Sequence, residues 1–412
     1  MAAPMLTVGE ALARVLGEVR PLPTVERPLE KALGLRLAVD VWADADQPPF
    51  DKALMDGYAV RASDLAELPR RLLLGETIAA GGLPSRPLGP GEAAVIMTGA
   101  PLPPGADAVV MVEKTARDGD GVAIRPQPIK PGMNLMPRGG IYRGGARLMT
   151  GGVDLTPARL GLLAAVGATA IRVYDVPKVA IVPTGDELVD FHETPGPGQI
   201  RNSNAPMLAA LTAGKGAEPW VSPILVDEPD ALRAGLAEAL KRDLVLAVGG
   251  VSAGQWDLVP ETLRSLGVRQ VFHKIRIRPG KPLWFGVGPD RDDDRPPALV
   301  FGLPGNPLSG LVNFLYFAAP ALDAMQGRPA TGPAFVPARA ARRFNRNATL
   351  NVFQAARVVE PREASRPAAV EPLENRGSSD LAAIVDADGF VEVPSGDGAI
   401  EPGEIVGFLP LG

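Results

Sequence analysis

Three long apolar runs, each ending in a glycine-rich turn, constrain the fold of this 412-residue chain more than any other feature. They read KVAIVPTGDEL, DLVLAVGGVSAG and PALVFGLPGNPLSG, at 178–188, 243–254 and 297–310. Strands without polar alternation suit a sheet that is covered on both faces. Helix-like segments separate or follow these runs, at 205–214, 229–242, 257–266 and 307–325. The alternation predicts a doubly wound parallel α/β domain, whose ligands bind outside the carboxyl ends of the strands, where all three turns fall.

Helical periodicity also marks two segments before this region. Apolar residues recur at helical spacing over 6–20, where Thr7 and Glu10 are placed for a capping box. The pattern returns at 153–167, and 27–40 indicates a second short helical or mixed segment. We therefore expect the helical pieces to flank an insertion and to form one element together.

Short apolar runs broken by Gly and Pro indicate β structure in two places. They fill the insertion, from about residue 46 to 150, and predict a small β-rich domain there. Similar runs at 330–412 predict a small β-barrel or sandwich. The charged loop 287–297 is interpreted as a solvated connection between strands.

Composition excludes several kinds of chemistry. The chain has no Cys and only His192 and His273, which excludes disulfides, thiolate nucleophiles, Fe–S clusters and three-histidine metal sites. A net charge of −5 disfavours nucleic acid as a partner. No run of about 20 uncharged apolar residues appears, so we expect no membrane span. Glu10 precedes any long apolar segment, so we expect no signal peptide and a cytoplasmic protein.

The turn GLPGNPLSG indicates an anion site. Asn306 is placed as the N-cap and Pro307 as the first residue of an apolar helix, whose free N–H groups and positive dipole end favour an anion. Ser309 adds a hydroxyl in the first turn. The alternative is a capped helix with no ligand.

A basic run points to the same chemistry. In HKIRIRPGKP, a strand would place Lys274, Arg276 and Arg278 on one face, and the Pro-Gly turn then presents Lys281. Such a comb in an acidic protein favours an oxyanion or phosphate ligand. A solvated strand face is the alternative.

Acidic residues near the glycine-rich turns are candidates for a magnesium site. Glycine pairs let backbone amides approach a ligand, and the carboxylates of Asp186, Glu187, Asp227 and Asp257 follow or lie near the strand ends. Carboxylates suit Mg²⁺, which usually bridges to a substrate phosphate. Each acid is also explained as a cap or a surface charge, and Asp257 in particular as a helix cap.

Two turns in the β-rich insertion carry further polar candidates. In ALMDGYAV, Asp56 lies between apolar residues in a loop that would fix its carboxylate. Met97-Thr98-Gly99 ends a strand with a hydroxyl group. An ordinary Asp-Gly turn is the alternative for the first.

Taken together, the motifs resemble those of a known family. MDGYAV, MTGAPLPPGADAVV, PTGDEL, GQIRNSN, GGVSAG, PGKP and LPGNPLSG occur in this order, as in the molybdopterin molybdenumtransferases, which include the E domain of gephyrin. The resemblance runs from about residue 5 to 412 and is strongest between 50 and 325. It implies an elongated N-terminal helical domain at 1–46 and 150–177, an inserted β-rich domain at 47–149, an α/β molybdopterin-binding domain at 178–328 and a C-terminal β-barrel domain at 329–412.

The resemblance also implies a reaction and an assembly. The reaction is the insertion of molybdate into adenylated molybdopterin, with release of AMP assisted by Mg²⁺. The assembly is a homodimer whose cleft combines the inserted domain of one subunit with the α/β domain of the other. Transient contacts with other molybdenum-cofactor proteins are compatible with this role.

Site residues follow from the resemblance position by position. The implied catalytic residues are Asp56, Thr98, Glu187, Asp227, Asp257 and Lys274, with Glu187 and Asp257 as magnesium ligands. The implied residues for binding the pterin substrate or molybdate are Gly249, Gly250, Ser252, Arg278, Lys281, Pro304, Gly305, Asn306, Ser309 and Ser378.

The chain departs from the family pattern in two places. NLMPRGGIYRGG has Met136 where the family usually has Arg and Ile141 where it usually has Asp. FQAAR has Ala355 at the usual Arg position, although Arg357 would reach the same face of a strand. Losing one cation from an oxyanion site typically costs about 1.5–3 kcal/mol, so these changes predict weakened activity.

Three hypotheses remain open at this stage. The first is an active molybdenumtransferase. The second, supported by Met136, Ile141 and Ala355, is a paralogue that binds molybdopterin or its cofactor as a carrier or scaffold. The third is a pyrophosphatase or amidase that acts on a nucleotide through the α/β domain.

Overall fold

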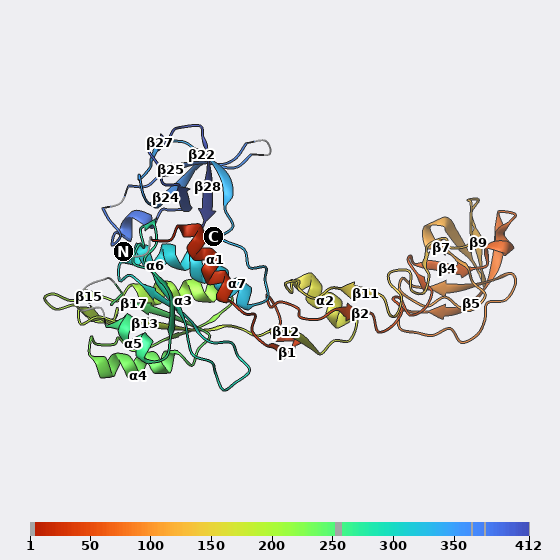
Figure 1. Ribbon diagram of the computed structural model, residues 1–412. Helices are drawn as coiled ribbons and strands as arrows, with labels where there is room; N and C mark the ends of the chain where they lie inside the picture. The colour runs from red at the N-terminus through yellow and green to blue at the C-terminus, as the bar shows by residue number, and fades with distance from the viewer. Residues whose placement is uncertain (1–4, 252–257, 364–365, 375, 412) are drawn as a thin grey trace. The chain divides into compact units, whose positions relative to one another are not determined.

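The computed structural model describes residues 5–251, 258–363, 366–374 and 376–411, which form two compact units (Figure 1). The first unit comprises residues 1–38, 154–156 and 171–412. The second comprises residues 39–153 and 157–170. The finer division into four domains stays a prediction.

A six-stranded sheet forms the centre of the first unit. Its order is β16-β13-β17-β21-β20-β18. The strands are β13 (Lys178–Pro183), β16 (Glu218–Val221), β17 (Leu244–Val248), β18 (Arg269–His273), β20 (Trp284–Val287) and β21 (Leu299–Leu303). The first four in spatial order are parallel, which confirms the predicted α/β fold, and β20 and β18 extend the sheet antiparallel. The short connection from β18 to β20 has no crossover helix, so these two strands pair antiparallel.

Helices cover both faces of this sheet, as the apolar strands require. The first face carries α1 (Val8–Glu18), α3 (Asn204–Gly214), α6 (Pro307–Asn313) and α7 (Ala319–Met325), and the second carries α4 (Pro229–Ala239) and α5 (Val259–Ser265). The chain passes from β13 to β16 on one side and then crosses to β17 on the other. The carboxyl ends of β13 and β17 therefore form a topological switch point, where α/β proteins bind ligands.

The N-terminal helix belongs to this core. Thr7 and Glu10 form the predicted capping box on α1, which contacts α7. The segment 27–40 is not a helix apart from a 3₁₀ turn at Leu29–Lys31; β1 (Thr24–Pro28) precedes that turn and pairs with β12 (Ala170–Tyr174). Proline at both ends of β1 and Gly34 in the segment oppose a regular helix there.

A long apolar helix runs through the core of the first unit. It comprises α6, a π-helical turn at Phe314–Ala318, and α7. Within the described part of the chain it is the one helix long and apolar enough to cross a membrane, and 89% of its most apolar window is buried inside the protein. Such burial is what a core helix of a globular domain shows.

The C-terminal part of the first unit is a closed barrel. Its strands are β22 (Val336–Ala340), β24 (Asn351–Glu360), β25 (Ala369–Pro372), β26 (Gly389–Val393) and β28 (Ile405–Pro410). They pair in the order β24-β25-β22-β28-β26, and β26 returns to β24 to close the ring. This confirms the predicted barrel. A short strand from the α/β domain, β19 (Ile277–Arg278), adds to β24 from outside.

The second unit contains the predicted β-rich insertion. Its main sheet has the order β7-β4-β6-β5-β9-β8. The strands are β4 (Gly57–Val60), β5 (Arg70–Ile78), β6 (Glu92–Ile96), β7 (Ala108–Met111), β8 (Thr115–Asp118) and β9 (Gly121–Ile124). Helix α2 (Pro157–Ala165) also belongs to this unit.

Short elements complete the two units. Those of the second unit are β2 (Val41–Trp42), β3 (Lys52–Ala53), β10 (Leu135–Met136) and β11 (Arg147–Met149), with 3₁₀ turns at Ala62–Leu65 and Val112–Lys114. Those of the first unit are β14 (Leu188–Val189), β15 (Ile200–Arg201), β23 (Phe344–Asn345) and β27 (Ala399–Ile400), with a 3₁₀ turn at Ala382–Ile384.

The charged loop 287–297 is more than a solvated connection. Its Arg295 makes a two-pronged contact with Asp243, at 2.7 Å from both Nε and Nη2, and reaches Asp175 at 2.6 Å. The Asp243 side chain is only 2% exposed. Burial would raise the pKa of Asp175, but hydrogen bonds from Arg295, the Val176 N–H and Arg27 outweigh it and lower that pKa. The loop therefore neutralises carboxylates at the amino ends of the strands.

Replacing Arg295 should destabilise the first unit strongly. Arg295→Met leaves Asp175 and Asp243 without their main cation, which typically costs about 3–5 kcal/mol. The matched control, Arg269→Met, breaks the exposed pair with Glu18 and should cost about 0–1 kcal/mol. Thermal unfolding of both variants measures the difference, and equal losses would contradict a special role for Arg295.

The effect should depend on pH in a defined direction. Because the folded pKa of Asp175 lies below its ordinary value of 3.8, its contribution to stability is complete above that pH and is lost as the pH falls through the folded value. The difference in unfolding free energy between wild type and Arg295→Met should therefore become smaller below about pH 4.

Candidate active site

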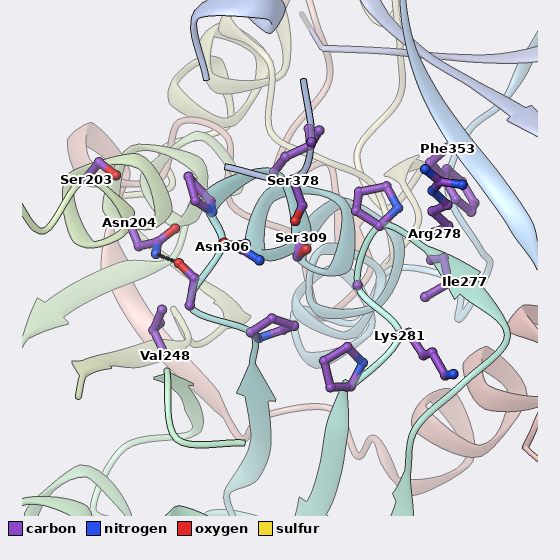
Figure 2. Close-up of a pocket in the computed structure, with 18 of the residues that line it drawn as sticks. Ser203, Asn204, Val248, Ile277, Arg278, Lys281, Asn306, Ser309, Phe353 and Ser378 are labelled. Carbon is purple, nitrogen blue, oxygen red and sulfur yellow. Dashed lines mark hydrogen bonds between the residues drawn. The ribbon is translucent and has the colours of Figure 1, made fainter. Parts of the chain in front are cut away.

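A cavity of about 880 Å³ lies in the first unit at the carboxyl ends of β13, β17 and β21 (Figure 2). Thr184 and Val248 form its floor at the switch point, and the turn 304–306 follows β21. The loop 277–282 and residues of the C-terminal barrel complete the wall. The cavity therefore forms where the α/β fold predicts a ligand site.

The cavity brings together half of the residues predicted for the site. Those that line it are Glu187, Arg278, Lys281, Pro304, Gly305, Asn306, Ser309 and Ser378. Gly249, Gly250, Asp227 and Lys274 do not line it, and Asp56 and Thr98 belong to the second unit. Ser252 and Asp257 lie outside the described residues. The roles assigned to all of these residues stay predictions.

The start of α6 has the expected form with one difference. Asn306 is the N-cap and Pro307 the first helical residue, but the Asn306 side chain makes no capping hydrogen bond. The N–H of Leu308 instead donates to the backbone carbonyl of Ser378 at 3.0 Å. This bond brings Ser378 of the barrel beside the helix start, and Figure 2 shows it next to the largely buried Ser309. Two hydroxyl groups and the helix start thus meet at the centre of the cavity.

The basic run does not form the comb that the sequence predicted. Lys274 follows the end of β18 with a φ of 69°, which interrupts the strand. The N–H of Arg276 donates to the Leu6 carbonyl at 2.9 Å. Arg276 also lies near Glu10, whose pKa is lowered mainly by hydrogen bonds from Thr7 and further by Arg276. Only Arg278 and Lys281 of the run line the cavity.

The charge of the cavity opposes that of the chain. Its wall has the cations Arg201, Arg278, Lys281 and Arg346 but a single carboxylate, that of Glu187. In the part of the chain that the structure describes, none of the four cations forms an ion pair with a carboxylate. A positive, partly enclosed cavity in an acidic protein attracts a ligand with several negative charges.

Two buried asparagines that the sequence analysis missed hold the cavity loops. Asn204, at the start of α3, donates from Nδ2 to the Gly305 carbonyl at 2.7 Å (Figure 2). Asn313, in α6, donates from Nδ2 to the Gly280 carbonyl at 3.2 Å. Both Oδ1 atoms are buried and have no hydrogen-bond partner among the residues that the structure describes. Nothing in the sequence signals these bonds, although GQIRNSN contains Asn204.

Glycines at the switch point allow the strand ends to approach closely. A Cβ on Gly249, whose φ is 100°, would lie 2.5 Å from the carbonyl oxygen of Thr184, and one on Gly250 would lie 2.8 Å from Val259. A side chain at either position would push apart the ends of β13 and β17 or displace α5. These glycines therefore shape the floor of the cavity without lining it.

The acidic candidates are arranged differently from one another. Glu187 lines the cavity and is exposed, whereas the N–H of Asp227 donates to Asp186 Oδ1 at 3.1 Å. Among the described residues no group of three His, Cys, Asp or Glu side chains is placed to hold a metal ion. A magnesium ion at Glu187 would thus need further ligands, such as oxygen atoms of a substrate phosphate.

In the second unit the structure joins the two polar candidates. Asp56 Oδ1 accepts hydrogen bonds from the N–H and the hydroxyl of Thr98, both at 2.7 Å. The backbone bond first and the side-chain bond second lower the pKa of Asp56. The pair therefore presents an ionised carboxylate at the surface of this unit.

The structure shows where the residues that depart from the family pattern lie. Ile141 is 57% exposed in the second unit, where Met136 is half-buried in β10. Ala355 is fully buried in the core beneath the barrel. Arg357 does not replace it, because its guanidinium binds Glu371, with an Nη2–Oε1 distance of 2.6 Å, and does not line the cavity. Arg357 lies two residues from Ala355 in β24, as expected, but it supplies no cation to the cavity.

Comparison with known proteins agrees with this architecture of an α/β domain, a C-terminal barrel and a β-rich insertion. Family models described as the MoeA N-terminal region (domain I and II), "Probable molybdopterin binding domain" and the MoeA C-terminal region (domain IV) match residues 6–167, 180–324 and 337–411. The chain belongs to the MoeA family of molybdopterin molybdenumtransferases.

Individual relatives span almost the whole chain. A molybdopterin molybdenumtransferase of Bacillus subtilis (strain 168) is 34% identical over 98% of this chain and 94% of its own length. One of Nostoc sp. (strain PCC 7120) is 41% identical over 72% of this chain and 68% of its own length. A crystal structure of a molybdopterin biosynthesis MoeA protein from Pyrococcus horikosii has a TM-score of 0.84 at 32% identity, covering 99% of both chains.

The contact between Gly280 and Asn313 gives a test of how the cavity loop is held. Gly280 has a φ of 104°, and an added Cβ would lie 2.7 Å from Asn313 Oδ1. Gly403 has a similar φ of 98° with nothing within 4 Å, so Gly403→Ala measures backbone strain alone, about 1–2 kcal/mol. Gly280→Ala should lower the unfolding temperature more than this control.

A double substitution separates the crowding between an added Cβ at position 280 and Asn313 from the backbone strain at Gly280. Asn313→Ala removes the atom that Gly280→Ala would meet, so the two substitutions together should cost less than the sum of their separate effects. Strict additivity in thermal unfolding would show that Asn313 does not restrain the loop through Gly280.

Proposed function

We propose that the chain is an active molybdenumtransferase, which inserts molybdate into adenylated molybdopterin and releases AMP. The observation that carries the proposal is the positive cavity at the switch point, which combines the start of α6, two serines and Lys281. Molybdate is a tetrahedral dianion, and cations, hydroxyl groups and the positive end of a helix dipole are partners that such an anion prefers. Membership of the family supports the same substrates.

Each group has a role in this proposal. Ser309, Ser378 and Lys281 hold the molybdate oxygens near the helix start, and Arg278 neutralises the phosphoanhydride. Water attacks the pterin-side phosphorus of the phosphoanhydride, the P–O bond to AMP breaks, AMP leaves with the electron pair, and the protons of the water pass to solvent. The two dithiolene sulfurs then form bonds to molybdenum, and one molybdate oxygen leaves as water with the two thiol protons, without a change of oxidation state. The Asp56–Thr98 pair of the second unit contributes to the same reaction.

Magnesium fits the proposal through Glu187. Mg²⁺ is usually bound by one or two carboxylates together with substrate phosphates, and Glu187 is the carboxylate that lines the described cavity. Asp257 is proposed as its companion ligand. When bound, the ion would offset negative charge on the phosphoanhydride. Glu187 itself would orient the substrate phosphates around the ion.

The assembly and location are also proposals. We propose a homodimer in the cytoplasm, without nucleic acid or membrane as partners. The net charge of −5 supports the first of these exclusions, because nucleic-acid-binding proteins concentrate positive charge. Transient contacts with other molybdenum-cofactor proteins would deliver the substrate and remove the product.

A second function is favoured by one observation. Ala355 is buried and Arg357 is bound to Glu371, so neither supplies the cation that the family pattern has there. A paralogue that binds molybdopterin as a carrier would tolerate this loss. The transferase and the carrier would both bind molybdopterin, but only the transferase would release AMP.

Release of AMP distinguishes the two functions. Purified protein is incubated with adenylated molybdopterin and Mg²⁺, with and without molybdate, and AMP is measured by chromatography. We expect release that requires Mg²⁺ and increases with molybdate. Tight binding of the adenylated pterin without any release would instead identify a carrier.

The helix start should control the molybdate response more than substrate binding. Ser309→Ala and Lys281→Ala should each raise the molybdate concentration for half-maximal AMP release about tenfold, because each removes a charge-assisted contact. Binding of adenylated molybdopterin should change much less. Lys241→Ala, which removes a surface lysine paired with Glu238, is the control. If the molybdate response and the binding of adenylated molybdopterin were weakened equally, Ser309 and Lys281 would not be molybdate-binding residues.

A further inference from the structure

The cavity contains a cation from the C-terminal barrel that sequence analysis did not assign. Arg346 follows β23 directly and lines the cavity. It is half-buried, and within the described residues its guanidinium has no carboxylate partner. A half-buried arginine has lost part of its hydration, and a bound anion would compensate for that loss.

Arg346 is held in place on both sides. Its backbone N–H donates to the Gly398 carbonyl at 3.1 Å, and its Nη1 donates to the Pro394 carbonyl at 3.1 Å. Both acceptors are neutral and lie in the turn 394–398. The guanidinium is therefore fixed at one nitrogen, and its charge and other N–H groups remain for a ligand.

A chain of contacts connects this turn to the loop that presents Lys281. The N–H of Ser395 donates to Asn351 Oδ1 at 3.1 Å, and the N–H of Asn351 donates to the Arg276 carbonyl at 3.0 Å. Asn351 also begins the pairing of β24 with β19, which leads directly into that loop. The barrel cation and the loop cations are thus parts of one connected framework.

The other cavity cations differ from Arg346. Arg201 lies in the exposed strand β15, and its Nε donates to the Glu193 carbonyl. Arg278 and Lys281 are also exposed. Exposed charges are screened by salt, whereas a half-buried one is screened less. Among these four cations, Arg346 is therefore the one whose attraction to a bound anion is screened least by solvent and salt.

We infer that Arg346 is an oxyanion-binding residue, which the C-terminal barrel supplies to the cavity of the α/β domain. Its ligand is a tetrahedral oxyanion, either a phosphate of the phosphoanhydride or molybdate. The inference rests on the proposed function for the identity of these anions. It assigns to the barrel a direct contact with substrate at a residue that no sequence motif marked.

Direct binding tests this inference without turnover. Isothermal titration with molybdate, and separately with inorganic pyrophosphate, is carried out on wild type, Arg346→Ala, Arg346→Lys and Arg343→Ala. Arg343 is the matched control, because it is an exposed barrel arginine that lies 3.6 Å from Glu401 and does not line the cavity. Thermal unfolding of each variant verifies that the barrel is folded.

We expect Arg346→Ala to weaken binding of at least one anion about tenfold or more, since hydrogen bonds to charged groups typically contribute this much. Arg346→Lys should restore part of the loss, because it keeps the charge but not the planar donor geometry. Selective loss of molybdate or of pyrophosphate binding identifies which oxyanion Arg346 contacts. The control should match wild type.

Two results would overturn the inference. One is wild-type affinity of Arg346→Ala for both anions, and the other is the absence of binding of either anion to wild type. Failure of the proposed function is distinguishable from both. In that case AMP release is absent from wild type while the anion binding and its dependence on Arg346 persist.

Discussion

The short parallel pairing of β19 with β24 is the interaction on which the cavity depends. It joins the α/β domain to the barrel through Ile277 and Arg278, and the loop that carries Lys281 follows at once. On the other side of the cavity, the N–H of Leu308 donates to Ser378. These two contacts hold barrel residues against the carboxyl ends of the strands. Without them the switch point would be an open edge rather than an enclosed site.

Features that depend on local sequence were predictable. The capping box of Thr7 and Glu10, the apolar strands of the central sheet and Pro307 at the start of α6 are all encoded by neighbouring residues. The barrel was predictable as β structure because its runs are short and broken by Gly and Pro. Of the three predicted turns, one contributes Thr184 and Glu187 to the cavity and another contributes residues 304–309, whereas Gly249 and Gly250 of the third do not line it.

Features that depend on contacts between distant segments were not predictable. Asn204 and Asn313 act through the carbonyls of Gly305 and Gly280, far away in sequence, and no pattern marks an asparagine for such a contact. Lys274 was expected in a strand, but its backbone is left-handed. Likewise, the charged loop looked solvated because the sequence does not show that Arg295 meets carboxylates from two other segments.

The hydrogen bond from Leu308 to Ser378 has a consequence for selectivity. A bare helix start offers its free N–H groups to any small anion, including sulfate and inorganic phosphate. Here Pro307 has no N–H, and the N–H groups of Leu308, Ser309 and Gly310 all donate to protein carbonyls. The start of α6 alone therefore binds small anions less well. Selectivity for the ligand instead depends on side chains of the α/β domain and of the C-terminal barrel. This arrangement therefore lowers the affinity for small anions such as sulfate more than the affinity for a ligand that contacts both the α/β domain and the barrel.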